Sequence, residues 1–280
     1  MTSAGMVIAV RQKRVPTGLT LGGVLLSALA VSALVGPFLP LADPAAQDLL
    51  GTLRPPSEMH WLGTDHLGRD VLSRVVHGAA RSLGIAVLCV ALAGGLGLLL
   101  GLAAAMGGRL THALIMRFAD LVLAFPGLLL ALLLAGFLGG GIIPLMVGIK
   151  LTLWPQFARM ASATAKVTLG EVHVEAARLA GLSNLHILRH HLLPPVLRNT
   201  ISLMTLGIGS AIMSISSLGF LGLGLQPPTP EWGAMISELL PYTTEAPIQM
   251  AAPCLLIMAS VLGFTLVGEA LTERLSGVRR

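Results

Sequence analysis

The sequence predicts an all-α membrane protein with six transmembrane helices. Of its 280 residues, 54% are hydrophobic and 11% are charged, which is too little charge to cover a soluble domain of this size. Apolar blocks long enough to cross a bilayer as helices alternate with polar intervals. The six blocks cover residues 19–41, 82–106, 112–136, 142–165, 196–225 and 248–272.

The chain begins with a polar segment, residues 1–18, which carries Arg11, Lys13 and Arg14 ahead of the first apolar block. A basic start before an apolar run is also typical of a signal peptide. This run is long, however, and residues 39–45 (LPLADPA) offer no clear small-x-small cleavage site. We therefore expect an uncleaved first span. Because no internal repeat or low-complexity linker is visible, residues 19–280 are expected to form one six-helix domain.

A polar interval at residues 42–78, called the outer segment below, separates the first two spans. Thr64 or Asp65 is expected to cap a short helix, on which Asp70 and Arg74 form an i,i+4 pair. Catalysis by Asp65 and Asp70 is not expected, because no nucleophile or metal-ligand set accompanies them. We interpret these charges as fixing a plug against the mouth of the bundle.

The remaining spans carry packing and kinking residues. Four glycines of the second span suit close approach of helices in lipid: Gly94, Gly95, Gly97 and Gly101. Pro126 and Pro155 are expected to kink the third and fourth spans. Cys89 and Cys254 each lie inside an apolar block, so neither indicates a disulfide or a metal knuckle.

Polar residues inside the spans are candidates for a translocation cavity. Lys150 is the one basic residue deep in a span, where an ammonium group needs a wet cavity or a partner. Ser210, Ser214 and Ser217 fall on one face of the fifth span, and small residues there serve helix packing or line a pore. For Lys150 we keep both possibilities open, and for the serines packing is the favoured reading.

A second long polar interval between apolar blocks lies within residues 166–195, called the elbow below. Val172, Ala176 and Leu179 recur at helical spacing, with Glu171, Glu175 and Arg178 on the opposite face. Gly181 suits the left-handed end of that helix. Ser183 or Asn184 caps a second short helix carrying Leu185, Leu188 and Leu192, which Pro194-Pro195 should end. The result is a rigid elbow whose apolar face requires a partner or lies on the membrane surface.

The basic residues predict the orientation. Thirteen of the 18 lysines and arginines lie on the side of the N-terminus, four on the opposite side, and Lys150 within a span. The positive-inside rule therefore places both termini and the elbow in the cytoplasm. Despite the net charge of +5, nucleic-acid binding is not expected, because no basic run is interleaved with aromatic residues.

Two kinds of site are weighed and not expected. No lysine follows a glycine in the way that a P-loop requires, so the chain has no ATPase site of its own and no enzymatic activity is expected. His186, His190 and His191 have an i,i+4 spacing that suits a metal on a helix, but spacing alone has a high false-positive rate. No metal is expected.

Four motifs together resemble the permease subunits of the dipeptide, oligopeptide and nickel group of bacterial ABC importers. Glu175-Ala176-Ala177, with Gly181 and then Leu193-Pro194, resembles the EAA loop of such permeases. Residues 61–83, 116–132 and 217–236 resemble the GTDxxGRDxxSR, third-span and FLGLGxQPPTPEWG segments of the same group.

The resemblance implies a type I importer permease fold whose elbow is a coupling helix docking on an ATPase. The implied coupling residues are Glu175, Ala176, Ala177, Arg178, Gly181, Leu193 and Pro194. In the outer segment, the residues that match the GTDxxGRD signature are Thr64, Asp65, Gly68, Arg69 and Asp70.

It also implies that the chain lies in the bacterial cytoplasmic membrane. The implied partners are a second permease, two ATPase subunits that bind ATP and Mg²⁺, and an external solute-binding protein. This chain itself needs no cofactor. The expected cargo is a di- or oligopeptide, with nickel or a metal chelate as the alternative. The rival classes are a self-contained secondary carrier and a membrane-anchored assembly protein. A carrier usually has an intramembrane carboxylate relay, and here Asp120 and Glu269 lie towards the cytoplasmic ends of their spans.

Overall fold

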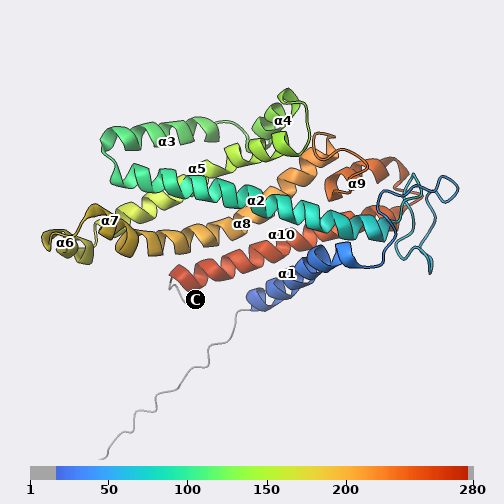
Figure 1. Ribbon diagram of the computed structural model, residues 1–280, viewed down its shortest axis with the longest axis horizontal. Helices are drawn as coiled ribbons and strands as arrows, with labels where there is room; N and C mark the ends of the chain where they lie inside the picture. The colour runs from blue at the N-terminus through green and yellow to red at the C-terminus, as the bar shows by residue number, and fades with distance from the viewer. Residues whose placement is uncertain (1–16, 277–280) are drawn as a thin grey trace, which may run out of the picture.

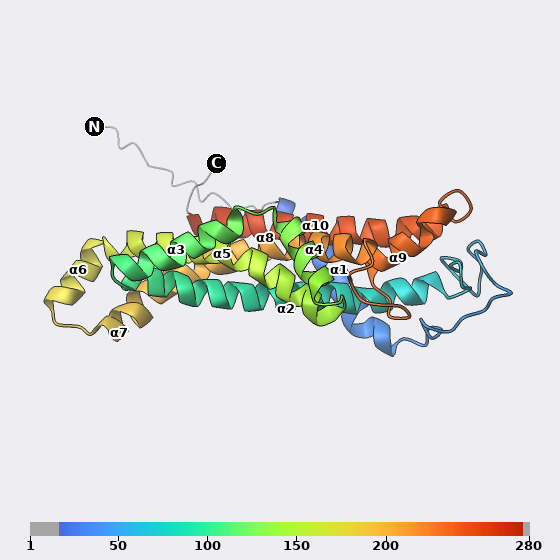
Figure 2. The same cartoon turned by 90° about the horizontal axis from the view of Figure 1, so that it is seen from above.

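The computed structural model describes residues 17–276. This part of the chain is helical, with no strand and one isolated antiparallel bridge between Thr64 and Asp70. The long helices lie side by side along the long axis of an elongated bundle (Figures 1 and 2). The predicted all-α class is therefore confirmed. The segments holding Arg11, Lys13, Arg14, Arg279 and Arg280 lie outside the described residues.

The helices of the described part follow one another along the chain with short connections, apart from the outer segment. Their bounds are α1 Thr17–Val35, η1 Gly36–Phe38, α2 Val71–Met106, α3 Arg109–Leu123, α4 Gly127–Phe137, α5 Ile142–Leu169, α6 Val172–Leu179, α7 Asn184–Ile187, the π-helical turn η2 Leu188–Leu192, α8 Leu193–Phe220, α9 Trp232–Leu239, η3 Leu240–Tyr242 and α10 Pro247–Ser276.

Four helical runs in the described residues are long and apolar enough to cross a membrane, against the six that the sequence predicts. They are Thr17–Phe38, Val71–Met106, Asn184–Phe220 and Pro247–Arg274. The pair α3 and α4 makes a fifth if it counts as one span, although the two helices meet at 85°. Helix α5 is long but carries Lys150, Arg159 and Lys166, which lower its hydropathy. It nevertheless packs against α2, α4 and α8 in the body of the bundle.

Several helix boundaries differ from the prediction for local reasons. Helix α2 begins at Val71 rather than at residue 82, because the Asp70 carboxylate caps it by accepting from the Ser73 N–H at 2.7 Å. The third predicted span breaks between α3 and α4, where Pro126 stands just before α4. Pro155, in contrast, lies inside α5, and the helix continues through it to Leu169.

The expectation that Pro194-Pro195 ends a short helix is wrong. The π-helical turn Leu188–Leu192 joins α7 directly to α8, and the prolines occupy the first turn of α8. In the widened turn, the Leu193 N–H bonds to the Leu188 carbonyl. Proline lacks an N–H, and the first turn of a helix tolerates it because the N–H groups there have no partner within that helix. The fifth predicted span therefore begins inside the elbow, as one continuous helical run.

Close packing of α2 and α5 forms the centre of the bundle. A Cβ on Gly97 would lie 2.5 Å from the Cβ of Phe157, and one on Gly101 would lie 2.5 Å from the Ala158 carbonyl oxygen. A Cβ on Gly94 would lie 2.7 Å from the Met204 sulfur of α8, whereas a Cβ on Gly95 would meet nothing within 4 Å. Three of the four glycines thus serve close helix contact as predicted, and Gly95 does not.

Candidate functional site

The elbow lies at one end of the bundle, opposite the outer segment and α9 (Figures 1 and 2). Helix α6 ends as the sequence predicts, with Gly181 in the left-handed region at φ +78°. The Ser183 hydroxyl then caps α7 by accepting from the His186 N–H. Both turn residues of the predicted corner therefore do what their chemistry suggests, and α6 projects from the bundle end.

The apolar side chains of the elbow divide into two sets. Val174 and Ala177 are buried, and Val174 belongs to a small apolar cluster with Ile187 and Leu192. Val172, Leu179 and Leu185 are 81%, 87% and 71% exposed. The face that the sequence predicts to need a partner has none in the described chain.

The other coupling candidates are distributed around this exposed face. Glu175, Ala176, Arg178, Gly181 and Pro194 are exposed, and Leu193 is half-buried. Ala177 is the exception, because it packs inward and fixes α6 to the bundle. Val174, which the sequence pattern did not single out, shares that role and lies three positions before Ala177 on the same side of α6.

At the opposite end, the outer segment is fastened to α9 by buried ion pairs. The Arg69 guanidinium donates through Nε to Asp65 at 2.6 Å and through Nη2 to Glu238 at 2.6 Å. Arg74 donates to the same Glu238 oxygen at 2.8 Å, and its Nε lies 3.5 Å from Asp65. The two arginine side chains are 1% exposed and Glu238 is 17% exposed. Two carboxylates thus neutralise two buried guanidinium groups.

The predicted short helix at Thr64 or Asp65 is absent from the described outer segment, which is a compact loop. Thr64 accepts from the Arg54 N–H at 2.8 Å, and Asp65 accepts from the N–H groups of Leu67 and Arg69. Gly68, at φ +73°, has no room for a side chain against the backbone of Asp48.

The predicted pair of Asp70 with Arg74 is wrong. Asp70 caps α2 and lies 2.9 Å from Nδ1 of His60. Arg74 instead points towards Asp65 and Glu238, because the loop folds back over the first turns of α2 and brings these carboxylates to it.

Helix α9, which the sequence did not reveal, begins at a fully buried carboxylate. Glu231 accepts from the N–H groups of Gly233 and Ala234 at 2.8 and 2.9 Å. Burial raises the pKa of this carboxyl group, and these two hydrogen bonds oppose the rise. The next residue, Trp232, is buried and donates its indole N–H to the Val75 carbonyl of α2 at 3.0 Å. A glutamate is an uncommon cap, so the sequence signal was weak.

Asp65, His66 and Glu238 also bring their ligand atoms within 4.8 Å of one another, which is metal-like spacing. Both carboxylates already bond to Arg69 and Arg74. A cation there would face two guanidinium charges, so the geometry supports an ion-pair network instead.

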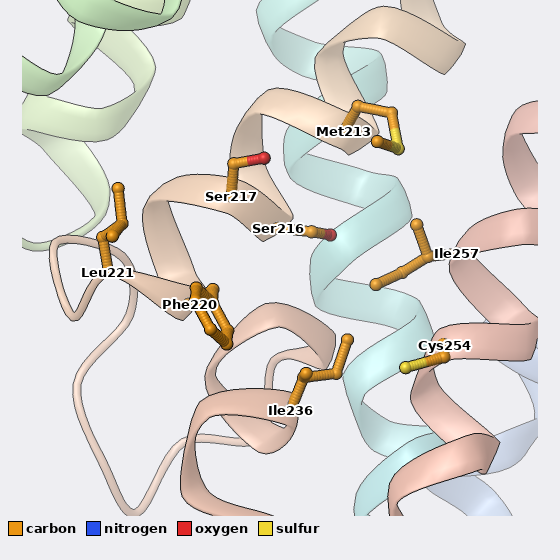
Figure 3. A pocket seen from close by; sticks show the side chains of 8 residues that line it. All are labelled: Met213, Ser216, Ser217, Phe220, Leu221, Ile236, Cys254 and Ile257. Atoms are coloured by element: carbon orange, nitrogen blue, oxygen red, sulfur yellow. The ribbon is translucent and has the colours of Figure 1, made fainter. Parts of the chain in front are cut away.

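A cavity of about 420 Å³ opens between α8, α9 and α10. Apolar side chains line most of it, among them Met213, Phe220 and Ile257, together with the hydroxyls of Ser216 and Ser217 (Figure 3). A second hollow of about 410 Å³ continues it along α8 and α10. The described chain thus has an apolar furrow along these helices.

The four predicted cavity residues do not converge. Ser217 lines the cavity, but Ser210 and Ser214 do not, and the Ser214 hydroxyl bonds to the Ser210 carbonyl at 3.0 Å. Lys150 is half-buried on α5 and lies close enough to Cys89 of α2 to interact electrostatically. No hydrogen bond or ion pair of Lys150 is formed with the residues that the structure describes.

Residues 97–277 match the family of binding-protein-dependent transport system inner membrane components. The chain belongs to this family.

The matches to curated relatives cover most of the chain. It is 38% identical over 253 residues to the nickel transport system permease protein NikC of Escherichia coli K12, covering 90% of this chain and 91% of the relative. It is 40% identical over 262 residues to the di/tripeptide transport system permease protein DppC of Pseudomonas aeruginosa, covering 91% and 86%. The glutathione transport system permease protein GsiD of E. coli O6:K15:H31 is 41% identical, covering 79% of this chain and 73% of the relative.

The fold has a solved counterpart. An inward-facing structure of the MetNI methionine ABC transporter superposes with a TM-score of 0.56 at 17% identity, covering 75% of this chain and 98% of that one. The predicted membership in the peptide and nickel permease group is therefore confirmed, as is a fold shared with an ABC transporter. These relatives are named as permeases for different cargoes at nearly equal identity.

Proposed function

We propose that this chain is a permease subunit of an ATP-driven importer and that it forms the membrane pathway together with a second permease. Two ATPase subunits would bind at the elbow, and an external solute-binding protein would deliver cargo at the outer segment. The observation that carries the proposal is the exposed apolar face of Val172, Leu179 and Leu185 at the tip of the bundle. Exposed apolar patches of this kind mark interaction sites.

The orientation of the proposal follows from charge. Basic residues of the described part gather towards the elbow end, whereas Glu238 on α9 and Glu245 in the turn before α10 lie at the other end. Helix α10 runs from the outer end back towards the elbow end (Figure 1). The elbow and both termini are therefore assigned to the cytoplasm. In this assignment α3 and α4 together form one broken span. Helix α5 is also a span and brings the total to six.

The elbow suits mechanical coupling because it is rigid and continuous with a span. Val174 packs in the cluster with Ile187 and Leu192 and holds α6 to the bundle, and α7 passes through the π-helical turn into α8 without a break. A displacement of the elbow by a bound ATPase would therefore be transmitted to α8, which lines the cavity. This chain contributes motion and a pathway, and the partner subunits hydrolyse ATP.

The proposed cargo is a di- or oligopeptide, with nickel or a metal chelate as the alternative. Lys150 supports the peptide. An ammonium group within the bundle with no carboxylate bonded to it attracts an anionic group, such as a peptide C-terminus. A bare divalent cation would be repelled by it. The names of the relatives do not separate these cargoes, because both kinds occur at similar identity.

Reconstitution tests the proposal. The chain should copurify with an ATPase pair and a second permease, and proteoliposomes of the complex should take up peptide only with ATP and the solute-binding protein. Uptake by this chain alone, driven by an ion gradient, would instead identify a secondary carrier. Competition with unlabelled dipeptide, Ni²⁺ or a nickel chelate would then identify the cargo.

A further inference from the structure

Four of the eight histidines of the chain gather at the elbow. The rings of His186 and His190 stack with their centroids 4.2 Å apart, and His191 lies 6.1 Å from His186. His173, which belongs to α6, approaches His191 to 5.3 Å. The sequence spacing of three histidines alone did not favour a metal, but the fold adds a fourth from a different helix.

The π-helical turn produces this gathering. In an α-helix, residues four apart share a face, which brings His186 beside His190. The wider turn at Leu188–Leu192 makes residues five apart neighbours as well, so His191 also faces His186. The fold of the elbow then lays α6 beside this turn and supplies His173.

A second, independent observation concerns the ring nitrogens. Nδ1 of His173 lies 3.0 Å from a Glu171 carboxylate oxygen, and Nδ1 of His190 lies 3.2 Å from the His186 carbonyl oxygen. Histidines that bind metals usually donate one ring N–H to a carboxylate or a backbone carbonyl, which leaves the other nitrogen free as a ligand. Two of the four rings already have that partner, and their Nε2 atoms are available.

We propose that His173, His186, His190 and His191 form a binding site for a divalent late transition metal such as Zn²⁺, Ni²⁺ or Co²⁺. Neutral imidazole suits these ions, and four nitrogen ligands provide a tetrahedral set. The rings are exposed or half-exposed, and a bound ion would require them to rotate, with His186 and His190 unstacking, to reach the bonding distance of about 2.0–2.1 Å. The exposed Arg189 directly precedes His190, and the Glu171 carboxylate beside His173 offsets part of the positive charge.

Metal binding would tie α6 to the π-helical turn, and thus the tip of the elbow to the start of α8. This consequence rests on the proposed function, because His173 directly follows Val172 on α6, so an ion held there would stand beside the face on which the ATPase docks. We expect bound metal to slow uptake. Metal binding by the permease itself does not depend on the transport assignment, so the two are tested separately.

The binding experiment uses the full chain in detergent, purified through a tag that contains no histidine. Titration with Zn²⁺ should show one site, and Co²⁺ should give the visible absorption of a tetrahedral complex. The variant His186→Gln/His190→Gln should bind at least tenfold more weakly, and Glu171→Gln roughly 10–100-fold more weakly. His77→Gln is the matched control, because Nδ1 of His77 also lies beside a carbonyl four residues earlier, at 2.8 Å, but at the other end of α2.

The absence of a tetrahedral Co²⁺ spectrum in the wild-type chain would overturn the site, and so would equal Zn²⁺ affinity of wild type and the double variant. In the assembled transporter, micromolar Zn²⁺ should slow uptake by the wild type and not by the double variant. Slowing of both to the same extent would overturn the regulatory role. If neither the wild type nor the double variant transports any cargo without metal, the proposed function fails while the binding result stands.

Discussion

Arg69 and Glu238 lie 169 positions apart in the chain, and yet Nη2 of Arg69 is 2.6 Å from Oε2 of Glu238. Arg74 shares the same carboxylate oxygen. One acidic side chain near the end of α9 therefore fastens the outer segment and the start of α2 to that helix. Because both arginines are buried, they depend on this shared carboxylate for neutralisation, and loss of its charge is costly.

We predict that Glu238→Gln destabilises the protein markedly. The change leaves two buried guanidinium groups with Asp65 as their remaining carboxylate, and breaking a buried ion pair costs roughly 3–5 kcal/mol. The melting temperature of the detergent-solubilised protein should fall clearly. Glu245→Gln, in the turn between α9 and α10, exposed and with no ion pair in the described structure, should leave it unchanged. Equal melting temperatures for both variants and the wild type would show that the ion-pair network does not stabilise the protein.

A second prediction concerns the contact of α2 with α5. Gly97→Ala and Gly101→Ala each insert a methyl group where backbone atoms of α5 lie within 3 Å, and overpacking of this kind costs roughly 1–3 kcal/mol. Gly95→Ala, on the same helix with open space at its Cβ, should be neutral or slightly stabilising. Thermal unfolding of the three variants in one detergent compares them directly. A loss of stability in Gly95→Ala equal to that in Gly97→Ala would refute the close-approach explanation.

A third prediction tests the corner of the elbow. At φ +78° a β-branched residue is strained, whereas asparagine adopts this conformation more readily. A side chain at Gly181 would meet nothing within 4 Å, so the effect is one of backbone conformation. We expect Gly181→Val to abolish uptake by the assembled transporter at normal membrane expression, and Gly181→Asn to retain most of it. Wild-type uptake by the valine variant would remove the coupling role.

The proposed orientation is tested with cysteines at two exposed positions. In a Cys254→Ala background, which removes the exposed native thiol, Thr244→Cys should react with an impermeant thiol reagent applied from outside. Leu185→Cys in the elbow should react only after the membrane is opened. Cys89 is buried and serves as an internal background. The opposite labelling pattern would reverse the orientation and remove the elbow from the ATPase side.

The last prediction concerns Lys150. If its ammonium group attracts the carboxylate of the cargo, Lys150→Glu should lose peptide uptake, because it replaces attraction with repulsion. Lys150→Met should keep basal ATPase activity in the assembled complex while uptake falls. Cargo-stimulated ATPase activity and uptake are measured together. Wild-type peptide uptake by Lys150→Glu would show that Lys150 does not contact the cargo.

The sequence by itself determined the helical class, the polar elbow, its glycine corner and the close approach at Gly97 and Gly101. These features depend on hydropathy over a helix length and on the backbone preferences of single residues, both of which are local. The motifs also indicated the family correctly. Exposure of Val172 and Leu179 followed from the same periodicity, because an amphipathic helix at the end of a bundle cannot bury both faces.

Only the tertiary structure decided the partners of the charged and histidine side chains. Local spacing suggested that Asp70 pairs with Arg74. In the fold, Arg74 forms an ion pair with Glu238, and Asp70 caps α2. The fold also places His173 beside His191. In addition, α7 continues through the π-helical turn into α8, whose first turn contains Pro194. Pairing between distant residues depends on how helices pack, and a hydrophobic pattern fixes which face of a helix is buried without fixing which helix covers it.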